Sequence, residues 1–259
     1  MTDRCPAAYV ELAHRLADAA GEIVRTYFRR SYDIATKSDS TPVTEADRAA
    51  ERAMRDILEE AVPDHGISGE EFGTVRGDAE HVWYLDPIDG TKAFIAGVPV
   101  FGTLIGLARG GRPLFGVIDQ AVSGERWAGG AGHPCTLNEE RVACRGGVDL
   151  TNAVLFTTSP DVYEHDDLEA LDRLRGDAGL VRYGADCYAF GMVAAGHADI
   201  AIECRLKDHD YCALVPVVES AGGVMTNWQG APVTLGTDTR VAAAGSAELH
   251  RAAVSRLTG

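Results

Sequence analysis

The sequence predicts a layered α+β protein built from two packed parts, and three observations predict it. Amphipathic patterns of helical length come first. Short β-type runs separated by glycine-rich turns follow from Val82, and helices alternate with strands in the second half. No repeat, low-complexity segment or clear linker interrupts the 259 residues. We therefore expect an N-terminal α+β lobe over residues 1–150 and a C-terminal α/β lobe over residues 151–259.

The N-terminal part is expected to begin with two helices. Apolar residues at three- and four-residue spacing predict a helix over residues 6–30, and a polar loop follows across residues 36–43. A second helix is expected from Thr44 to about Glu60. Thr44 and Asp47 stand three residues apart, as the two partners of a capping box do. This local pattern alone favours a helix-start role for Asp47 over a catalytic one.

The middle of the chain has the pattern of an antiparallel sheet. Short β-type runs separated by glycine-rich turns indicate strands that follow one another as a meander. We expect these strands over residues 82–86, 101–110, 112–120 and 124–130, with the turn-rich loop SGEEFG before them.

The second half is expected to mix both kinds of element. Strands are expected over residues 153–159, 180–184, 198–205 and 240–245. Helices are expected over residues 166–176, 186–197, 208–223 and 246–257. The third of these helices should end on Gly222 and Gly223, because glycine often terminates helices.

Composition narrows the classes of partner and compartment. The formal net charge is −15, which disfavours nonspecific nucleic-acid binding, since that needs basic patches. No apolar run approaches the roughly 20 residues of a membrane helix, and the N-terminus has no signal-peptide core. The six cysteines form no C-x-x-C pair, so we expect free thiols. We therefore expect a cytoplasmic protein with neither a nucleic-acid nor a membrane partner.

Carboxylates stand beside loop signals in four places. Each place alone has an ordinary structural explanation, as a solvated turn or as acids at a helix start. Their combination in one chain is harder to explain by turns. The four places are Asp47 in TEAD, Glu70 and Glu71 in GEE, Asp86 and Asp89 in DPIDGT, and Asp210 in KDHD.

These acids have the chemistry of a magnesium site that handles a phosphate ester. Magnesium prefers hard oxygen ligands, and two such ions can grip the attacking and leaving oxygens of the ester. Bound cations would also supply the positive charge that an acidic chain needs to hold a phosphate. Gly90 and Thr91 should begin a helix whose free N–H groups point at the phosphate. The Thr91 hydroxyl is placed to orient a water, with Asp47 accepting its proton.

Three motifs carry a family resemblance. GEE, WYLDPIDGT and HDYCALVPVVESAGG resemble the signatures of the inositol monophosphatase superfamily of magnesium-dependent phosphatases, and the resemblance runs from TPVTEAD to the final strand. It implies a layered αβαβα sandwich of the inositol monophosphatase and fructose-1,6-bisphosphatase type. It also implies two or three Mg²⁺ per site and a homodimer.

The resemblance also implies a role for each site residue. Thr91 and Asp47 would position the nucleophilic water, with Glu71 assisting around a loosely held metal, and the Gly90 and Thr91 backbone would contact the phosphate. The implied metal ligands are Glu70, Asp86, the carbonyl of Ile88, Asp89 and Asp210. One departure is plain: His209 stands where the family generally has tryptophan. The substrate wall therefore need not be that of an inositol enzyme.

Further stretches resemble the histidinol-phosphatase branch of the superfamily. They are GTKAFIAGVPVFGTLIGL, GVIDQAVSGERW, TTSPD and RYGADCYAF. In that branch the second lobe supplies the substrate pocket. The resemblance implies hydrolysis of L-histidinol phosphate to L-histidinol and phosphate, a step of histidine biosynthesis, by direct attack of a metal-activated water.

Asp186 and Glu203 are candidate substrate contacts. Histidinol phosphate carries an ammonium and an imidazole, which buried carboxylates suit better than they suit a neutral polyol. An equal alternative is that Asp186 caps a helix beginning at Cys187.

Two other functions stay open. One is an inositol-1-phosphate or broad-specificity sugar-phosphate phosphatase. The other is a superfamily member that acts mainly as an interaction protein, which a damaged metal set would favour, whereas this set is complete.

Overall fold

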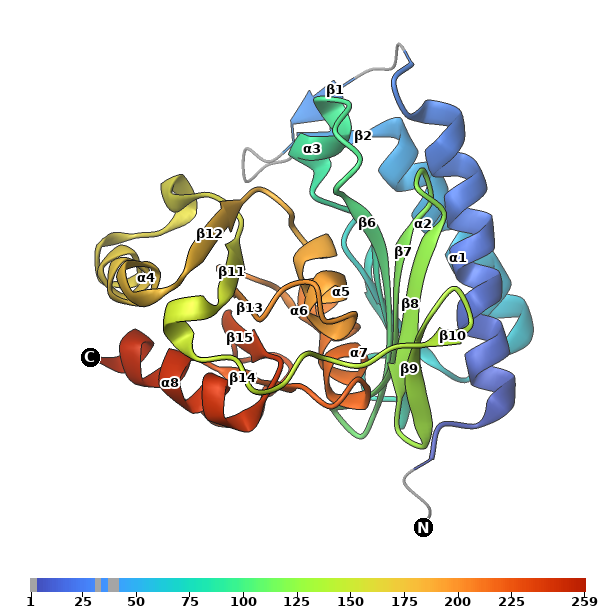
Figure 1. The fold of residues 1–259 in the computed structure, drawn as a ribbon. Coiled ribbons are helices and arrows are strands. Elements are labelled where there is room, and N and C mark those ends of the chain that lie inside the picture. The colour runs from blue at the N-terminus through green and yellow to red at the C-terminus, as the bar shows by residue number, and fades with distance from the viewer. Residues whose placement is uncertain (1–3, 31–33, 37–41) are drawn as a thin grey trace.

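The computed structural model describes residues 4–30, 34–36 and 42–259, and its elements stack in five layers (Figure 1). Helices and sheets alternate across the molecule, from the long N-terminal helices on one side to the C-terminal helix on the other. The expected αβαβα sandwich is therefore confirmed. The large sheet comes from the chain before residue 150 and the smaller sheet from the chain after it.

The first layer consists of α1 (Ala7–Tyr27) and α2 (Glu45–Ala61). Both helices bury one stripe against the large sheet, which is why their apolar residues recur at helical spacing. The helix expected over residues 6–30 ends at Tyr27, because Phe28 turns to an extended conformation. The loop expected over 36–43 is partly wrong. Two short antiparallel strands, β1 (Ile34–Thr36) and β2 (Pro42–Thr44), occupy its ends, and residues 37–41 lie outside the described residues.

The second layer is an eight-stranded sheet with the order β10-β9-β8-β7-β6-β5-β3-β4. The antiparallel meander expected from the sequence is confirmed for its four central strands. Prediction missed four strands of two to five residues, which are too short to show a period. The bounds are β3 Gly66–Gly69, β4 Gly73–Val75, β5 His81–Asp89, β6 Gly102–Arg109, β7 Arg112–Gln120, β8 Glu125–Gly130, β9 His133–Leu137 and β10 Glu140–Arg141.

One pairing in this sheet decides where the acids meet. β3 and β5 run parallel, whereas the other neighbouring strands run antiparallel. The carboxyl ends of two parallel strands lie at the same edge of a sheet. Glu70, directly after β3, therefore lies beside the end of β5, and its N–H donates to the carbonyl of Leu85 over 3.1 Å.

The central helical layer contains α5 (Tyr188–Ala194), α6 (Asp208–Tyr211) and α7 (Leu214–Ser220). The single helix expected over residues 208–223 is wrong, because the chain breaks between α6 and α7. Pro216 explains the break. It has no N–H for the Cys212 carbonyl four residues earlier, and its ring crowds that carbonyl.

The fourth layer is a five-stranded sheet with the order β12-β11-β13-β15-β14. β11 pairs in parallel with β12 and β13, and β15 pairs antiparallel with β13 and β14. The short β14 was missed by prediction, and the other four strands were expected. The bounds are β11 Val154–Thr157, β12 Leu180–Tyr183, β13 Ile200–Cys204, β14 Val224–Asn227 and β15 Arg240–Ala244.

The outer layer consists of α4 (His165–Asp177) and α8 (Ala247–Thr258), which pack on each other (Figure 1). The Ser246 side chain accepts the Leu249 N–H and so caps α8 at the expected position. α4 ends one residue beyond the glycine expected to stop it. Two short 3₁₀ turns, Leu150–Asn152 and Pro160–Val162, flank β11.

Two expectations about the chain as a whole can be compared with the structure. The six cysteines, which all lie in described segments, are free thiols, as expected. Within residues 4–30, 34–36 and 42–259, no helix combines the length and the apolar character needed to cross a membrane.

Candidate active site

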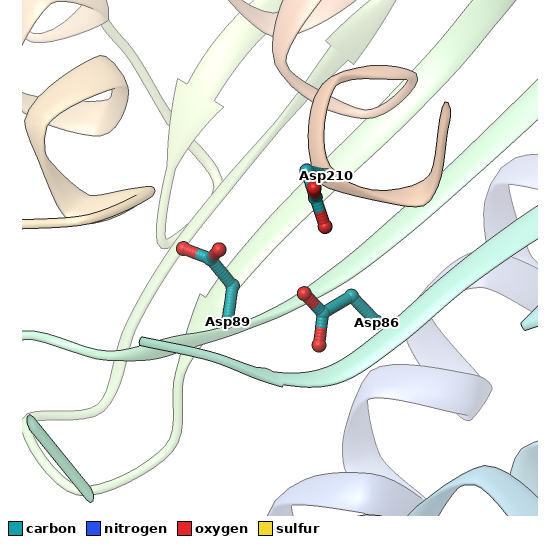
Figure 2. Close-up of side chains that lie close together, drawn as sticks. All are labelled: Asp86, Asp89 and Asp210. Carbon is teal, nitrogen blue, oxygen red and sulfur yellow. The ribbon is translucent and has the colours of Figure 1, made fainter. Parts of the chain in front are cut away.

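Three of the acids singled out in the sequence point into one shared space (Figure 2). Asp86 and Asp89 lie at the end of β5, and Asp210 lies on α6 from the other half of the chain. One oxygen from each carboxylate lies within 4.8 Å of the other two. Only 2% of Asp86 is exposed. Residues far apart in the sequence therefore form one compact acidic cluster.

A bulge in β5 explains why two aspartates three residues apart face the same way. In a regular strand, residues three apart point to opposite faces of the sheet. Here Asp86 pairs with Leu104 and Asp89 pairs with Gly102, so β5 contains one extra residue. The two aspartates consequently occupy ladder positions of the same face.

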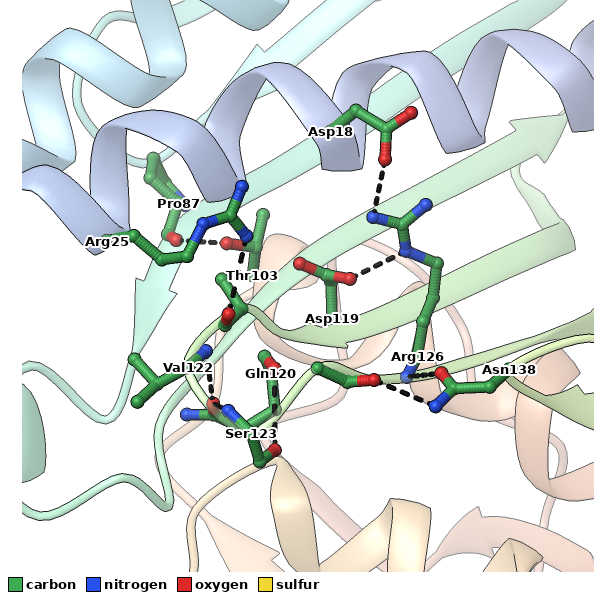
Figure 3. Close-up of polar contacts among 12 residues, drawn as sticks. Asp18, Arg25, Pro87, Thr103, Asp119, Gln120, Val122, Ser123, Arg126 and Asn138 are labelled. Carbon is green, nitrogen blue, oxygen red and sulfur yellow. Dashed lines mark hydrogen bonds and ion pairs between the residues drawn. The ribbon is translucent and has the colours of Figure 1, made fainter.

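Hydrogen bonds hold the Asp-Pro-Ile-Asp turn in place. Asp86 Oδ1 accepts the Ile88 N–H over 3.0 Å, and the Thr103 hydroxyl donates to the Pro87 carbonyl over 2.7 Å (Figure 3). The Thr91 hydroxyl donates to the Ile88 carbonyl over 3.1 Å. The turn that carries the acids is thus fixed from both neighbouring segments.

Gly90 ends this turn and begins the short helix α3 (Thr91–Ile95), as expected. Its φ of 84° lies in the left-handed region. A Cβ there would also lie 2.6 Å from Asp186 Oδ2. Both the backbone conformation and the close approach of Asp186 therefore require glycine.

The electrostatics of the cluster match a cation site. Burial raises the pKa of Asp86 well above its usual range, and Glu70, Asp89, Asp210 and Asp47 raise it further. All these effects disfavour the charged carboxylate. Hard oxygen donors that repel one another are the ligand type that a divalent cation such as Mg²⁺ prefers. The residues present therefore fit such an ion.

A cavity of about 560 Å³ opens beside the cluster. Glu70 and Asp89 line one side of it, whereas most of its wall comes from the second half of the chain, including Asp186, Glu203 and His209. The cluster and the residues expected to contact substrate thus share one cavity.

Asp186 occupies this wall without capping a helix. The N-cap of α5 is Cys187, and no side-chain capping bond forms there. Asp186 instead accepts a hydrogen bond from the Thr158 hydroxyl over 3.2 Å. The Cys187 N–H is accepted by Asp89 Oδ2 over 2.6 Å. The capping alternative for Asp186 is therefore wrong.

Glu203 lies in the middle of β13 and is only 6% exposed. Its Oε1 is buried and has no hydrogen-bond partner among the described residues. Burial raises the pKa of Glu203 well above the ordinary range, and Asp186 and Asp89 raise it further. A hydrogen bond from the Thr158 backbone lowers the pKa, so this carboxylate is satisfied only in part by the described residues.

His209 also lines the cavity and lies next to Asp210 of the cluster. Its Nε2 lies 3.4 Å from Asp210 Oδ1. Burial raises the pKa of Asp210, and the nearby His209 lowers it. An imidazole thus contacts the acid that the sequence predicted as a metal ligand.

Residues 7–258 match the model of the inositol monophosphatase family. The chain belongs to this family. It is therefore a phosphatase by family, in agreement with the resemblance carried by its three motifs.

The relatives of this chain include more than one kind of phosphatase. The bifunctional phosphatase IMPL2, chloroplastic, of Arabidopsis thaliana is 43% identical over 96% of this chain and 75% of its own length. A histidinol-phosphatase of Chlorobaculum parvum is 38% identical over 85% of this chain and 86% of its own. A solved inositol monophosphatase structure from Zymomonas mobilis has a TM-score of 0.90 and 44% identity, covering 98% of each chain.

Two predicted site residues, Asp47 and Glu71, come from α2 and from the turn after β3. Asp47 is 1% exposed on α2 and contributes to the raised pKa of Asp86. The Glu71 carboxylate is almost fully buried, with Arg48 Nε 3.7 Å away. Sequence reasoning missed Glu51, Thr158 and Cys187, which bond to the predicted residues or to their backbone. Of these, Glu51 had a readable signal, because it stands one helical turn after Asp47.

Proposed function

We propose that this chain is a magnesium-dependent phosphomonoesterase that hydrolyses L-histidinol phosphate to L-histidinol and phosphate. One observation carries the proposal. The cavity is lined by acids of the cluster and by two further carboxylates, the buried Glu203 and the partly buried Asp186. Glu203 Oε1 has no partner in the part of the chain that the structure describes.

The chemistry of the wall favours a cationic substrate group. Histidinol phosphate carries an ammonium and an imidazole, whereas inositol phosphates carry only hydroxyls beside the phosphate. A buried carboxylate is best stabilised by a positive hydrogen-bond donor. Asp186 and Glu203 are therefore proposed to bind the ammonium or imidazolium end of the substrate.

The metal-binding role is proposed for five oxygen donors. Glu70, Asp86, the carbonyl of Ile88, Asp89 and Asp210 would hold two or three Mg²⁺. When bound, the ions supply positive charge to the phosphate and lower the pKa of water. The mutual repulsion among the acids supports this assignment.

The protein groups around the phosphate have separate proposed tasks. The Thr91 hydroxyl orients the attacking water, and Asp47 accepts its proton, so no covalent enzyme intermediate forms. Glu71 assists these residues, and the backbone N–H groups of Gly90 and Thr91 contact the phosphate. The N-terminal lobe would supply most metal ligands, and the C-terminal lobe the substrate wall and Asp210.

An alternative substrate is inositol 1-phosphate or a range of sugar phosphates. The 44% identity to the inositol monophosphatase from Zymomonas mobilis favours it. A role as an interaction protein is disfavoured, because every acid of the predicted metal set is present. We further propose that the protein is a homodimer, as the family resemblance implies.

Phosphate release ranks these functions directly. The purified protein is assayed with L-histidinol phosphate and with inositol 1-phosphate, each with Mg²⁺ and with EDTA. We expect a much higher kcat/KM for histidinol phosphate, and no release in EDTA. A preference for inositol 1-phosphate would overturn the substrate assignment, and full activity in EDTA would overturn the metal assignment.

A further inference from the structure

Glu51 is a buried acid that none of the proposed roles uses. It lies on α2 with 0% exposure, one helical turn after Asp47 and one turn before Arg55. Residues four apart lie on the same face of a helix, so these three side chains share one face. A fully buried carboxylate is costly unless several donors satisfy it, so its partners indicate its purpose.

The partners of Glu51 are backbone amides of the turn after β3. Its Oε2 accepts the Glu71 N–H over 2.7 Å, and its Oε1 accepts the Phe72 N–H over 3.2 Å. Arg55 completes the arrangement. Its Nε donates to Glu51 Oε1 over 2.7 Å, and its Nη2 donates to the Gly73 carbonyl. The Glu51 carboxylate and the Arg55 guanidinium thus both form hydrogen bonds to the backbone of residues 71–73.

Gly69, at the start of that turn, also fits against the carboxylate. A Cβ on Gly69 would lie 2.0 Å from Glu51 Oε1, and its φ lies outside the left-handed region. Space taken by Glu51, rather than backbone conformation, therefore excludes a side chain at this position. Glu51 therefore contacts the turn before Glu70, at Gly69, and after it, at Glu71 and Phe72.

Glu70 is consequently held from two directions. Its own N–H is bonded to Leu85 of β5, and the next two amides are bonded to Glu51 of α2. We propose that Glu51 is a positioning residue that fixes the turn 69–73 and so directs Glu70 and Glu71 toward the acidic cluster. This inference rests on the metal-binding role proposed above for Glu70.

A Glu51→Gln variant tests the inference with little change in side-chain size. Glutamine offers one acceptor oxygen and places an NH₂ group where a second acceptor stood, so a donor would face a donor. The matched control is Glu60→Gln, an exposed position on the same helix that removes the same charge. Both variants are made in the full-length protein.

Three measurements follow, and the first two do not need turnover. In Glu51→Gln, calorimetric titration of the metal-free protein should show Mg²⁺ affinity reduced by about 10- to 100-fold, as for other residues that orient metal ligands. Amide hydrogen exchange at Glu71 and Phe72 should become faster. In Glu60→Gln, both quantities should match the wild type. At saturating Mg²⁺, KM for the phosphate ester should stay close to the wild-type value in Glu51→Gln.

A second variant keeps the inference testable if Glu51→Gln fails to fold. Gly69→Ala leaves the carboxylate intact and pushes it away from the turn, so we expect the same loss of Mg²⁺ affinity. A folded Glu51→Gln with wild-type affinity would overturn the inference, as would a folded Gly69→Ala with wild-type affinity. If the wild type itself binds no Mg²⁺, the proposed function fails instead. Unchanged amide exchange at Glu71 and Phe72 would separately refute the hold of Glu51 on the turn.

Discussion

Two charged hollows of similar size lie on opposite sides of the large sheet, and they differ in how their charge is balanced. One is the cavity beside Asp86, Asp89 and Asp210. The other, about 480 Å³, lies between α1 and the strands β7–β9. In the second hollow, Arg126 bonds to Asp119 over 2.6 Å and to Asp18 over 2.8 Å (Figure 3). Two of its acids, Asp119 and Asp18, are thus paired with one guanidinium.

The pKa shifts of the acids in the two hollows differ in the same way. Burial raises the pKa of Asp119, and the nearby Arg126 lowers it. Burial also raises the pKa of Asp86, but there the neighbouring acids raise it further. Neighbouring charged groups thus oppose ionisation of Asp86 in the first hollow, whereas the Arg126 guanidinium favours ionisation of Asp119 in the second.

The largest effect is expected from Asp86→Asn. Loss of this proposed metal ligand, which would support several kcal/mol of charge stabilisation, should lower kcat/KM by about a thousandfold or more. The same change removes a buried, repelled carboxylate, so the metal-free variant should melt at a higher temperature than the wild type. Kinetic assays and calorimetry in EDTA check both effects. Retained activity of Asp86→Asn, or a Tm below that of the wild type in the absence of metal, would contradict the difference proposed between the two hollows.

A smaller but selective effect is expected from Asp186→Asn. Losing one desolvated charge-assisted pair costs on the order of 2–5 kcal/mol, so KM for histidinol phosphate should rise by about 30-fold or more. KM for inositol 1-phosphate should change little, because that substrate offers no cation. Steady-state assays with both esters measure the ratio. Equal changes for the two substrates would remove the argument for cation recognition.

The pH dependence of stability gives a third test, in EDTA. The pKa of Asp86 is raised in the folded state, so folding binds a proton between the ordinary carboxyl range near pH 4 and the raised value. The charged Asp86 carboxylate lowers the unfolding free energy of the wild type above this pH range. This destabilisation disappears as the pH falls through the range. The stability advantage of metal-free Asp86→Asn should therefore be largest at pH 8 and shrink toward pH 5.

Comparing the wild type with Asp86→Asn at each pH cancels the contribution of the histidines to stability, because both proteins contain them. Half-buried His14, for example, has a lowered pKa, mainly because of desolvation, and so destabilises the fold as the pH falls. Calorimetric melting curves across this range give the difference directly. If the stability advantage of Asp86→Asn grew toward pH 5, mutual repulsion among the acids would not be its cause.

The smallest effect concerns the paired hollow. Asp119→Asn weakens a bond to Arg126 between largely buried side chains and should cost about 2 kcal/mol of unfolding free energy. The Mg²⁺ dependence of activity should stay unchanged, because the opposite hollow keeps its acids. Denaturant unfolding and Mg²⁺ titration of activity check the two halves of this prediction. A strong loss of Mg²⁺ affinity would show that the hollows are coupled.

Local sequence patterns predicted most of the fold. Long helices such as α1 and long strands such as β7 carry enough residues to show a period. The two-residue β10 cannot show one. The interruption between α6 and α7 has a local signal, since Pro216 stands inside the helix expected there and lacks the N–H that a continuous helix would use.

The candidate site was predictable in composition but not in geometry. The motifs identified the acids, whereas the parallel pairing of β3 with β5 depends on a four-residue strand, Gly66–Gly69, with no strand-like pattern. The bulge that turns Asp86 and Asp89 to one face is likewise a property of the pairing with β6. Long-range contacts of this kind leave no local signal in a single sequence.

Calorimetric titration of Mg²⁺ into the metal-free protein tests the central claim most directly. The claim is that the unbalanced acids around Asp86 form a divalent cation site and that the paired acids around Asp119 do not. We predict saturable binding in the wild type and in Asp119→Asn, and strongly weakened or lost binding in Asp86→Asn. Equal binding in all three proteins, or no binding in the wild type, would contradict the claim.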